Sequence, residues 1–176
     1  MTLGQLSADV TSWAERAGYA TTRDADAWVL YSLGGELRYY VREDEDDSWW
    51  SVGHASRGDG ESLMFRAASE DILSRHLVEV FGISIRAAEK LPFLRLPFGP
   101  RDLAVGFTIS EVSEAGFRTL SRDGAGAIAM AVDETLSLLT LVPLSHYLEL
   151  TVPELKEAFL DEGGSPLLAG GQYRAL

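Results

Sequence analysis

The strongest constraint on the fold is a change in the spacing of apolar residues at Ala27. Before it, apolar side chains recur at intervals of three and four, and after it the period is two, which is typical of β-strands. The short apolar segments that follow are separated by turn residues such as Gly34-Gly35, as in consecutive antiparallel strands. We therefore expect a four-stranded antiparallel meander whose strands cover residues 28–31, 36–41, 48–52 and 63–65.

Helical patterns flank this meander. Ser7 and Ser69 have the character of N-caps, and Gly18 and Gly82 follow the apolar-periodic residues as helix stops. Thr151 begins a Thr-x-x-Glu capping box near the C-terminus. These signals predict helices over residues 7–18, 69–82, 143–148 and 151–163.

The remaining segments predict further strands and one irregular link. Three prolines between residues 92 and 100 exclude a helix and a central strand, so we expect an extended link there. Strands with helices mostly at the ends indicate the α+β class: a single domain over residues 1–176, with an antiparallel sheet flanked by helices at the N-terminus, middle and C-terminus. The further predicted strands are residues 105–112, 127–132 and 136–141.

The charge limits which partners the chain can bind. Fifteen basic and 27 acidic residues give a net charge of −12, so the surface repels nucleic acid and anionic lipid and attracts a basic protein. The apolar run at 138–144 contains Pro143 and is too short to span a bilayer. The first residues lack the charged and apolar regions of a secretory signal. We expect a cytoplasmic protein that binds neither nucleic acid nor membrane.

Catalytic and cofactor patterns are not found in the sequence. No pair among His54, His76 and His146 has the i, i+4 spacing of a helix-borne metal site, and there is no cysteine to join them. A Gly-x-Ser-x-Gly elbow is also absent. We therefore expect no catalytic residues, no metal and no cofactor. A small enzyme using Glu36 or Asp59 with His54 is an alternative, although nothing in the sequence brings these groups together.

An acidic run provides the best candidate for a contact surface. Five consecutive carboxylates cannot be buried, so they must form an exposed loop, and the run lacks the spacing and glycine of a calcium loop. Aromatic pairs flank it, and in a strand one residue of each adjacent pair faces away from the core. Outward aromatic side chains beside fixed charge are typical of interface hot spots. The candidates, including two charged residues of the next turn, are Glu43, Asp44, Glu45, Asp46, Asp47, Trp49, Trp50, Arg57 and Asp59.

The order of several motifs along nearly the whole chain resembles one family, the immunity proteins typified by the immunity factor for the tuberculosis necrotizing toxin. Individually these motifs are weak, and the resemblance depends on their order and spacing. The residues that carry it are Trp13, Gly18-Tyr19, Gly34-Gly35-Glu36-Leu37-Arg38-Tyr39, Phe81-Gly82, Arg86, Leu91-Pro92, Pro97, Leu144-Ser145-His146-Tyr147-Leu148, Phe159-Leu160-Asp161 and Pro166-Leu167.

The resemblance implies a non-enzymatic inhibitor. Members of that family neutralise a secreted toxin domain that hydrolyses NAD⁺, by blocking its substrate cleft. The partner would then be a cognate toxin domain in a 1:1 heterodimer. An acidic secretion chaperone or adaptor is the alternative from another class: it would shield a partner without inhibiting it.

Overall fold

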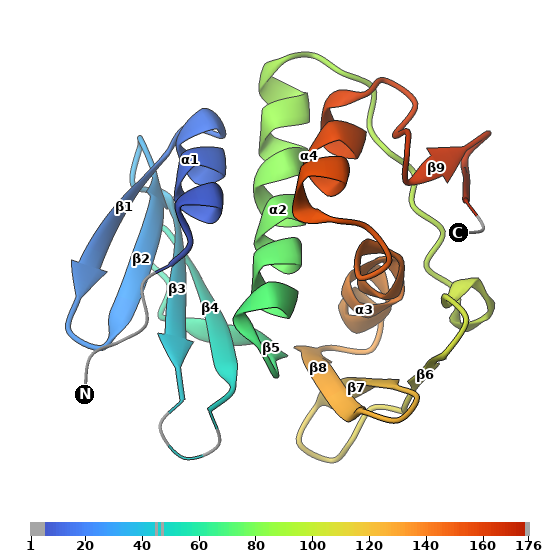
Figure 1. Cartoon of the computed structure of the whole chain (residues 1–176). Coiled ribbons are helices and arrows are strands. Elements are labelled where there is room, and N and C mark those ends of the chain that lie inside the picture. The colour runs from blue at the N-terminus through green and yellow to red at the C-terminus, as the bar shows by residue number, and fades with distance from the viewer. Residues whose placement is uncertain (1–5, 45, 47, 175–176) are drawn as a thin grey trace.

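The computed structural model describes residues 6–44, 46 and 48–174 and contains an eight-stranded antiparallel sheet (Figure 1). The strand order is β1-β2-β3-β4-β5-β8-β7-β6, so the predicted meander forms the middle of a larger sheet. This confirms the α+β class with an antiparallel meander. The strands are β1 Tyr19–Asp24, β2 Ala27–Ser32, β3 Leu37–Glu43, β4 Trp50–Ser56, β5 Ser62–Ala67, β6 Phe107–Ile109, β7 Phe117–Arg122 and β8 Gly126–Val132.

Three of the four helices begin where their caps predict, whereas the helix expected to start at Pro143 begins at Leu136 and contains Pro143 in its interior. The side chains of Ser7 and Ser69 accept hydrogen bonds from backbone N–H groups of the first turns of α1 and α2. At α4, the capping box is complete, because Thr151 and Glu154 each bond the other's backbone N–H. The helices are α1 Ala8–Arg16, α2 Glu70–Ala88, α3 Leu136–Tyr147 and α4 Val152–Leu160, with the 3₁₀ turn η1 Pro100–Asp102 and a small hairpin of β9 Leu168–Ala169 and β10 Gln172–Tyr173.

Helix α2 lies at the centre of the molecule (Figure 1). Helix α1 lies beside it over the first strands, and α3 and α4 lie on its other side. The register aligns Val41, Val52 and Phe65 across β3, β4 and β5, and all three are buried. The ring of Phe65 stacks on His76 of α2 with 4.0 Å between ring centroids. The core thus lies between the sheet and α2.

Two predictions about helices were wrong. Gly82 does not end α2, which continues to Ala88. A Cβ at Gly82 would lie 2.6 Å from Cγ of Phe159, so this glycine allows α2 and α4 to approach closely. The segment 136–141, predicted as a strand, is the first half of α3. A short apolar run does not distinguish a strand from a buried helix by its period.

Strands β1 and β7 were not predicted. In β1 only Tyr19 is buried, because this strand forms the edge of the sheet and its other side chains face solvent at least in part. No helix in the described residues is long and apolar enough to cross a bilayer.

Candidate functional site

The acidic loop joins β3 to β4 and is closed by Asp44. The backbone N–H of Asp44 donates to the carbonyl of Trp49 at 2.7 Å, and the N–H of Ser48 donates to the carbonyl of Asp44 at 3.0 Å. The Asp44 carboxylate accepts hydrogen bonds from Ser51 Oγ at 3.3 Å and from Arg66 Nη2 at 2.7 Å. Asp44 therefore stabilises the loop through hydrogen bonds and also contributes to its negative charge.

The structure distinguishes the two tryptophans. Trp50 opposes Glu43 and Ala67 in the sheet register and is only 6% exposed, so it is the member of the candidate pair that faces the core. Trp49 is half-buried, and the guanidinium carbon of Arg66 lies 5.5 Å from its ring centroid. Trp49 is thus the aromatic side chain that the loop presents at the surface.

The β1–β2 turn lies at the same end of the sheet, because alternate turns of a meander share an end (Figure 1). Arg42 of β3 bonds Asp26 of that turn through Nε at 3.1 Å. Asp24, Glu43 and Asp46 are exposed and form no ion pair within the described part of the chain. We name this surface the acidic end, defined by Asp24, Asp26, Glu43, Asp44 and Asp46. Glu45 and Asp47 lie outside the described residues.

The candidates Arg57 and Asp59 do not join the acidic end. They lie in the β4–β5 turn, which the meander places at the opposite end of the sheet. There Arg57 pairs with Glu36 at 3.1 Å, and the hydroxyl of Ser56 donates to Asp59. The structure thus divides the predicted contact residues between two ends of one sheet.

The side chains of the enzyme alternative have other partners. Glu36 and Asp59 are engaged as described above, while the ring of His54 lies 5.3 Å from that of Tyr39. No cluster of three metal-ligating side chains occurs among the described residues.

Sequence reasoning missed an apolar groove. It has a volume of about 620 Å³ and lies between α2, α3 and residues 91–98, which we name the strap. Several apolar side chains at the groove are well exposed, with Phe93 at 75%. Its lining is Met64, His76, Glu79, Val80, Ile83, Arg86, Ala87, Leu91, Phe93, Leu94, Arg95, Leu96, Phe98, Leu139, Thr140 and Phe159.

Two buried titratable groups line one part of the groove. Burial lowers the pKa of His76 to about 3, and both ring nitrogens lack a hydrogen-bond partner within the described structure. Burial raises the pKa of Glu79 to about 8, although the hydrogen bond from Tyr147 Oη at 2.9 Å opposes that rise. Both groups are therefore neutral near pH 7. Their neutral state depends on the side chains that bury them in the folded protein. No sequence pattern could therefore have predicted it.

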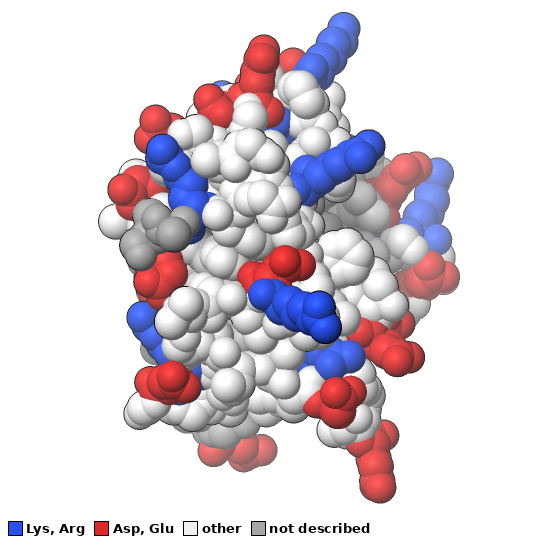
Figure 2. Space-filling view, turned by 90° about the vertical axis from the view of Figure 1, so that its right-hand side faces the viewer, with Lys and Arg blue, Asp and Glu red and all other residues white. Residues whose placement is uncertain are grey.

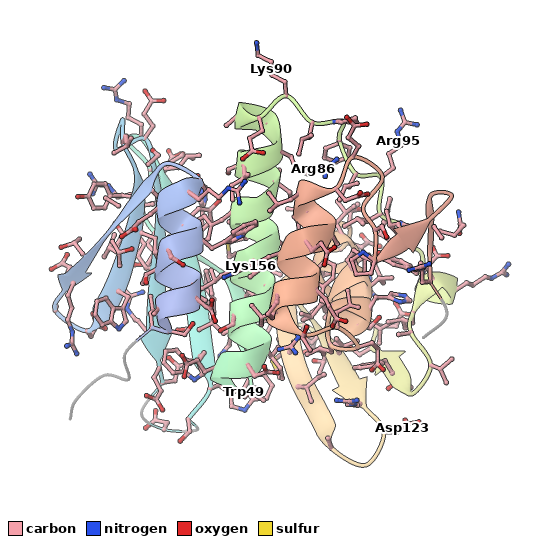
Figure 3. All side chains as sticks on the ribbon, turned by 45° about the horizontal axis from the view of Figure 1, so that its top comes forward. Trp49, Arg86, Lys90, Arg95, Asp123 and Lys156 are labelled. Carbon is pink, nitrogen blue, oxygen red and sulfur yellow. The ribbon has the colours of Figure 1, made fainter. Side chains whose placement is uncertain are left out.

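Arg86 fixes the strap to the body of the protein. Its guanidinium is buried and donates to four backbone carbonyls: to Pro92 at 2.9 Å, to Phe159 at 3.0 Å, to Asp161 at 2.6 Å and to Glu162 at 3.0 Å. Figure 3 shows Arg86 between the far part of α2 and α4, while Trp49 lies near the start of α2. Arg86 therefore connects the end of α2 to the nearby strap and to the end of α4, which is 73 or more residues away in sequence.

Other residues that carry the family resemblance are also structural. Ser145 Oγ accepts from the N–H of Ala104 at 3.1 Å. Nε2 of His146 lies 2.6 Å from the carbonyl of Asp102. The motif around these residues therefore holds α3 to the segment before β6.

Comparison with known proteins identifies the family. Residues 13–167 match the family model described as Immunity protein 61. Two relatives, the Immunity factor for TNT of Mycobacterium tuberculosis (strain ATCC 25618 / H37Rv) and its homolog in Mycobacterium bovis (strain BCG / Pasteur 1173P2), are each 32% identical over 174 residues, covering 95% of this chain and of the relative. The solved structure of Rv3902c from M. tuberculosis matches with a TM-score of 0.80 and 30% identity, over 92% of each chain. The chain belongs to the Immunity protein 61 family.

Proposed function

We propose that this protein is an antitoxin that binds a cognate NAD⁺ glycohydrolase toxin domain and inhibits it by occupying its substrate cleft. The observation that carries the proposal is the similarity, over nearly the whole chain, to an immunity factor for the tuberculosis necrotizing toxin. The solved relative has the same fold over the same extent.

The acidic end is the surface we assign to the cleft. A cleft that accepts the pyrophosphate of NAD⁺ needs positive charge, so exposed carboxylates would be attracted to it and would accelerate association. Glu43 and Asp46 are exposed without an ion pair in the described structure, and Trp49 lies beside them at the surface. An aromatic side chain next to such carboxylates would add buried apolar area to the contact.

The expected assembly is a 1:1 heterodimer formed in the cytoplasm before the toxin is exported. The immunity protein performs no turnover in this proposal and needs no cofactor. Its interface should reach about 1,600 Å² or more, because tight inhibition requires a stable complex.

The test is a titration of the purified cognate toxin domain with this protein while NAD⁺ hydrolysis is measured. We expect the rate to fall linearly to near zero at one equivalent. The double variant Glu43→Lys, Asp46→Lys should inhibit less tightly, whereas Arg57→Ala, at the opposite end of the sheet, serves as the matched control. Full hydrolysis in excess inhibitor would refute the proposal. Binding without inhibition would instead indicate the acidic chaperone or adaptor.

A further inference from the structure

Hydrogen bonds hold the strap at both ends, but within the described structure the backbone of its central residues has no hydrogen-bond partner. Arg86 bonds the carbonyl of Pro92, and the hydroxyl of Tyr173 donates to the carbonyl of Pro97 at 2.8 Å. Leu94 is buried and packs toward Gly164, where an added Cβ would lie 3.0 Å from a Leu94 methyl. The strap is therefore anchored against the body without any pairing of its central backbone.

The central backbone of the strap is a free edge. Residues 91–98 run without helix, turn or bend. Within the described part of the chain, the N–H and C=O groups of residues 93–96 form no hydrogen bond. Backbone groups of this kind pair with water or with an added strand. Because prolines stand at both sides of this run, its extended course is already set before any partner arrives.

The groove beside this edge has a matching length. The α2 residues that line it, from His76 to Ala87, form one stripe along the helix. At 1.5 Å per residue this stripe is about 16 Å long, which corresponds to about five residues of an extended chain. The groove could therefore take the apolar side chains of a strand added to residues 93–96.

The strap and the residues that flank it are also basic, in a protein whose net charge is −12. Residues 90–101 contain Lys90, Arg95 and Arg101 and no acidic residue. All three are exposed and have no ion pair within the described structure. Figure 3 shows Lys90 and Arg95 pointing away from the body, and Figure 2 shows a broad, largely uncharged area on this side of the molecule, with basic and acidic side chains within and around it. These cations favour a partner segment that carries a carboxylate.

We propose that the strap and the groove bind an extended segment of the toxin domain. The segment pairs its backbone with residues 93–96, places apolar side chains in the groove and directs a carboxylate to Arg95. This inference rests on the proposed function for the identity of the partner. A long-chain lipid would fill the groove but would leave the free backbone edge unused, so the peptide accounts for more of the structure.

Hydrogen exchange followed by mass spectrometry, on the full chain alone and saturated with the cognate toxin domain, tests this directly. The amides of residues 93–96 should exchange at least about tenfold more slowly in the complex, because strand addition protects them. Phe93→Ser and Arg95→Glu should each raise the Kd for the toxin domain about tenfold. Val105→Ser is the matched control, since Val105 is 99% exposed and does not line the groove.

The outcomes separate this inference from the proposed function. Inhibition with unchanged exchange at residues 93–96 and unchanged Kd in both strap variants would overturn the inference and leave the proposed function intact. Absence of any complex would overturn both. If palmitate binds wild type but not Phe93→Ser, while the toxin domain leaves the strap amides unprotected, the groove is a lipid site and the inference is wrong.

Discussion

The two ends of α2 use arginine in opposite ways. Near its start, Arg42 and Arg66 are partly exposed and pair with carboxylates, Arg42 with Asp26 and Arg66 with Asp44 of the acidic end. Near its other end, Arg86 is 3% exposed and bonds only backbone carbonyls. Exposed ion pairs contribute about 0–1 kcal/mol to stability, whereas removing one member of a buried polar network lowers the free energy of unfolding by several kcal/mol. Exposed charges such as Glu43 and Asp46 of the acidic end can therefore be replaced at little cost in stability, whereas the buried charge of Arg86 cannot.

The largest expected effect is that of Arg86→Met. Four backbone carbonyls would lose their donor, and the strap would lose its anchor, so the free energy of unfolding should fall by about 3–5 kcal/mol. Urea denaturation measures this. Arg95→Met, in the same region but exposed, should change stability by less than about 0.5 kcal/mol. Equal effects of the two substitutions would remove the distinction between the two kinds of arginine.

Gly82→Ala tests the close approach of α2 and α4. The added methyl would lie 2.6 Å from Cγ of Phe159, which is fully buried, and overpacking of this kind costs about 1–3 kcal/mol. The control is Gly60→Ala in the β4–β5 turn, where a Cβ meets nothing within 4 Å. A thermal melt in which Gly82→Ala is as stable as wild type would show that the two helices separate easily.

Glu79 should make stability depend on pH. Its folded pKa of about 8 lies above the ordinary 4.5, so the folded state holds more protons between these values and stability falls as the pH rises. His76, at about 3 instead of 6.5, has the opposite effect between pH 3 and 6.5. The two slopes cancel between pH 4.5 and 6.5, and a net loss of about 2 kcal/mol remains between pH 6.5 and 8.

Urea denaturation of wild type and Glu79→Gln across pH 5–9 measures that loss. The glutamine keeps an acceptor for the Tyr147 hydroxyl and has no proton to release, so its stability should be flat above pH 6.5. Parallel curves for the two proteins would contradict the assignment of the pH dependence to Glu79.

The smallest effect on stability is expected at the acidic end. Glu43→Lys with Asp46→Lys should change the free energy of unfolding by less than about 0.5 kcal/mol, since both side chains are exposed. The same variant should associate with the toxin domain about tenfold more slowly at low salt, and high salt should narrow the difference. Stopped-flow association at two salt concentrations measures this. An association rate that is insensitive to both the substitutions and the salt concentration would show that the acidic end does not contribute to the encounter with the toxin domain.

Local signals predicted the parts of the fold that depend on neighbouring residues. The caps at Ser7, Ser69 and Thr151 and the central strands follow from spacing alone. The helical conformation of the apolar run at 136–141 does not follow from spacing, because it depends on packing against β7 and β8. The same holds for β1, a largely exposed edge strand.

The candidate site was predictable only in part. The sequence shows that a run of carboxylates must be exposed, and the structure places the described members Glu43, Asp44 and Asp46 at a sheet end. Which tryptophan faces outward depends on the register that opposes Trp50 to Ala67. The groove combines Met64, Ile83 and Leu139 from three elements, so no local pattern could reveal it.

The most direct test of the central claim is competition between this protein and NAD⁺ for the toxin domain. Affinity would be measured by calorimetry, with and without a saturating non-hydrolysable NAD⁺ analogue. If the protein occupies the cleft, the analogue should raise the apparent Kd in proportion to its concentration. An unchanged Kd, with both bound together, would contradict occlusion of the cleft.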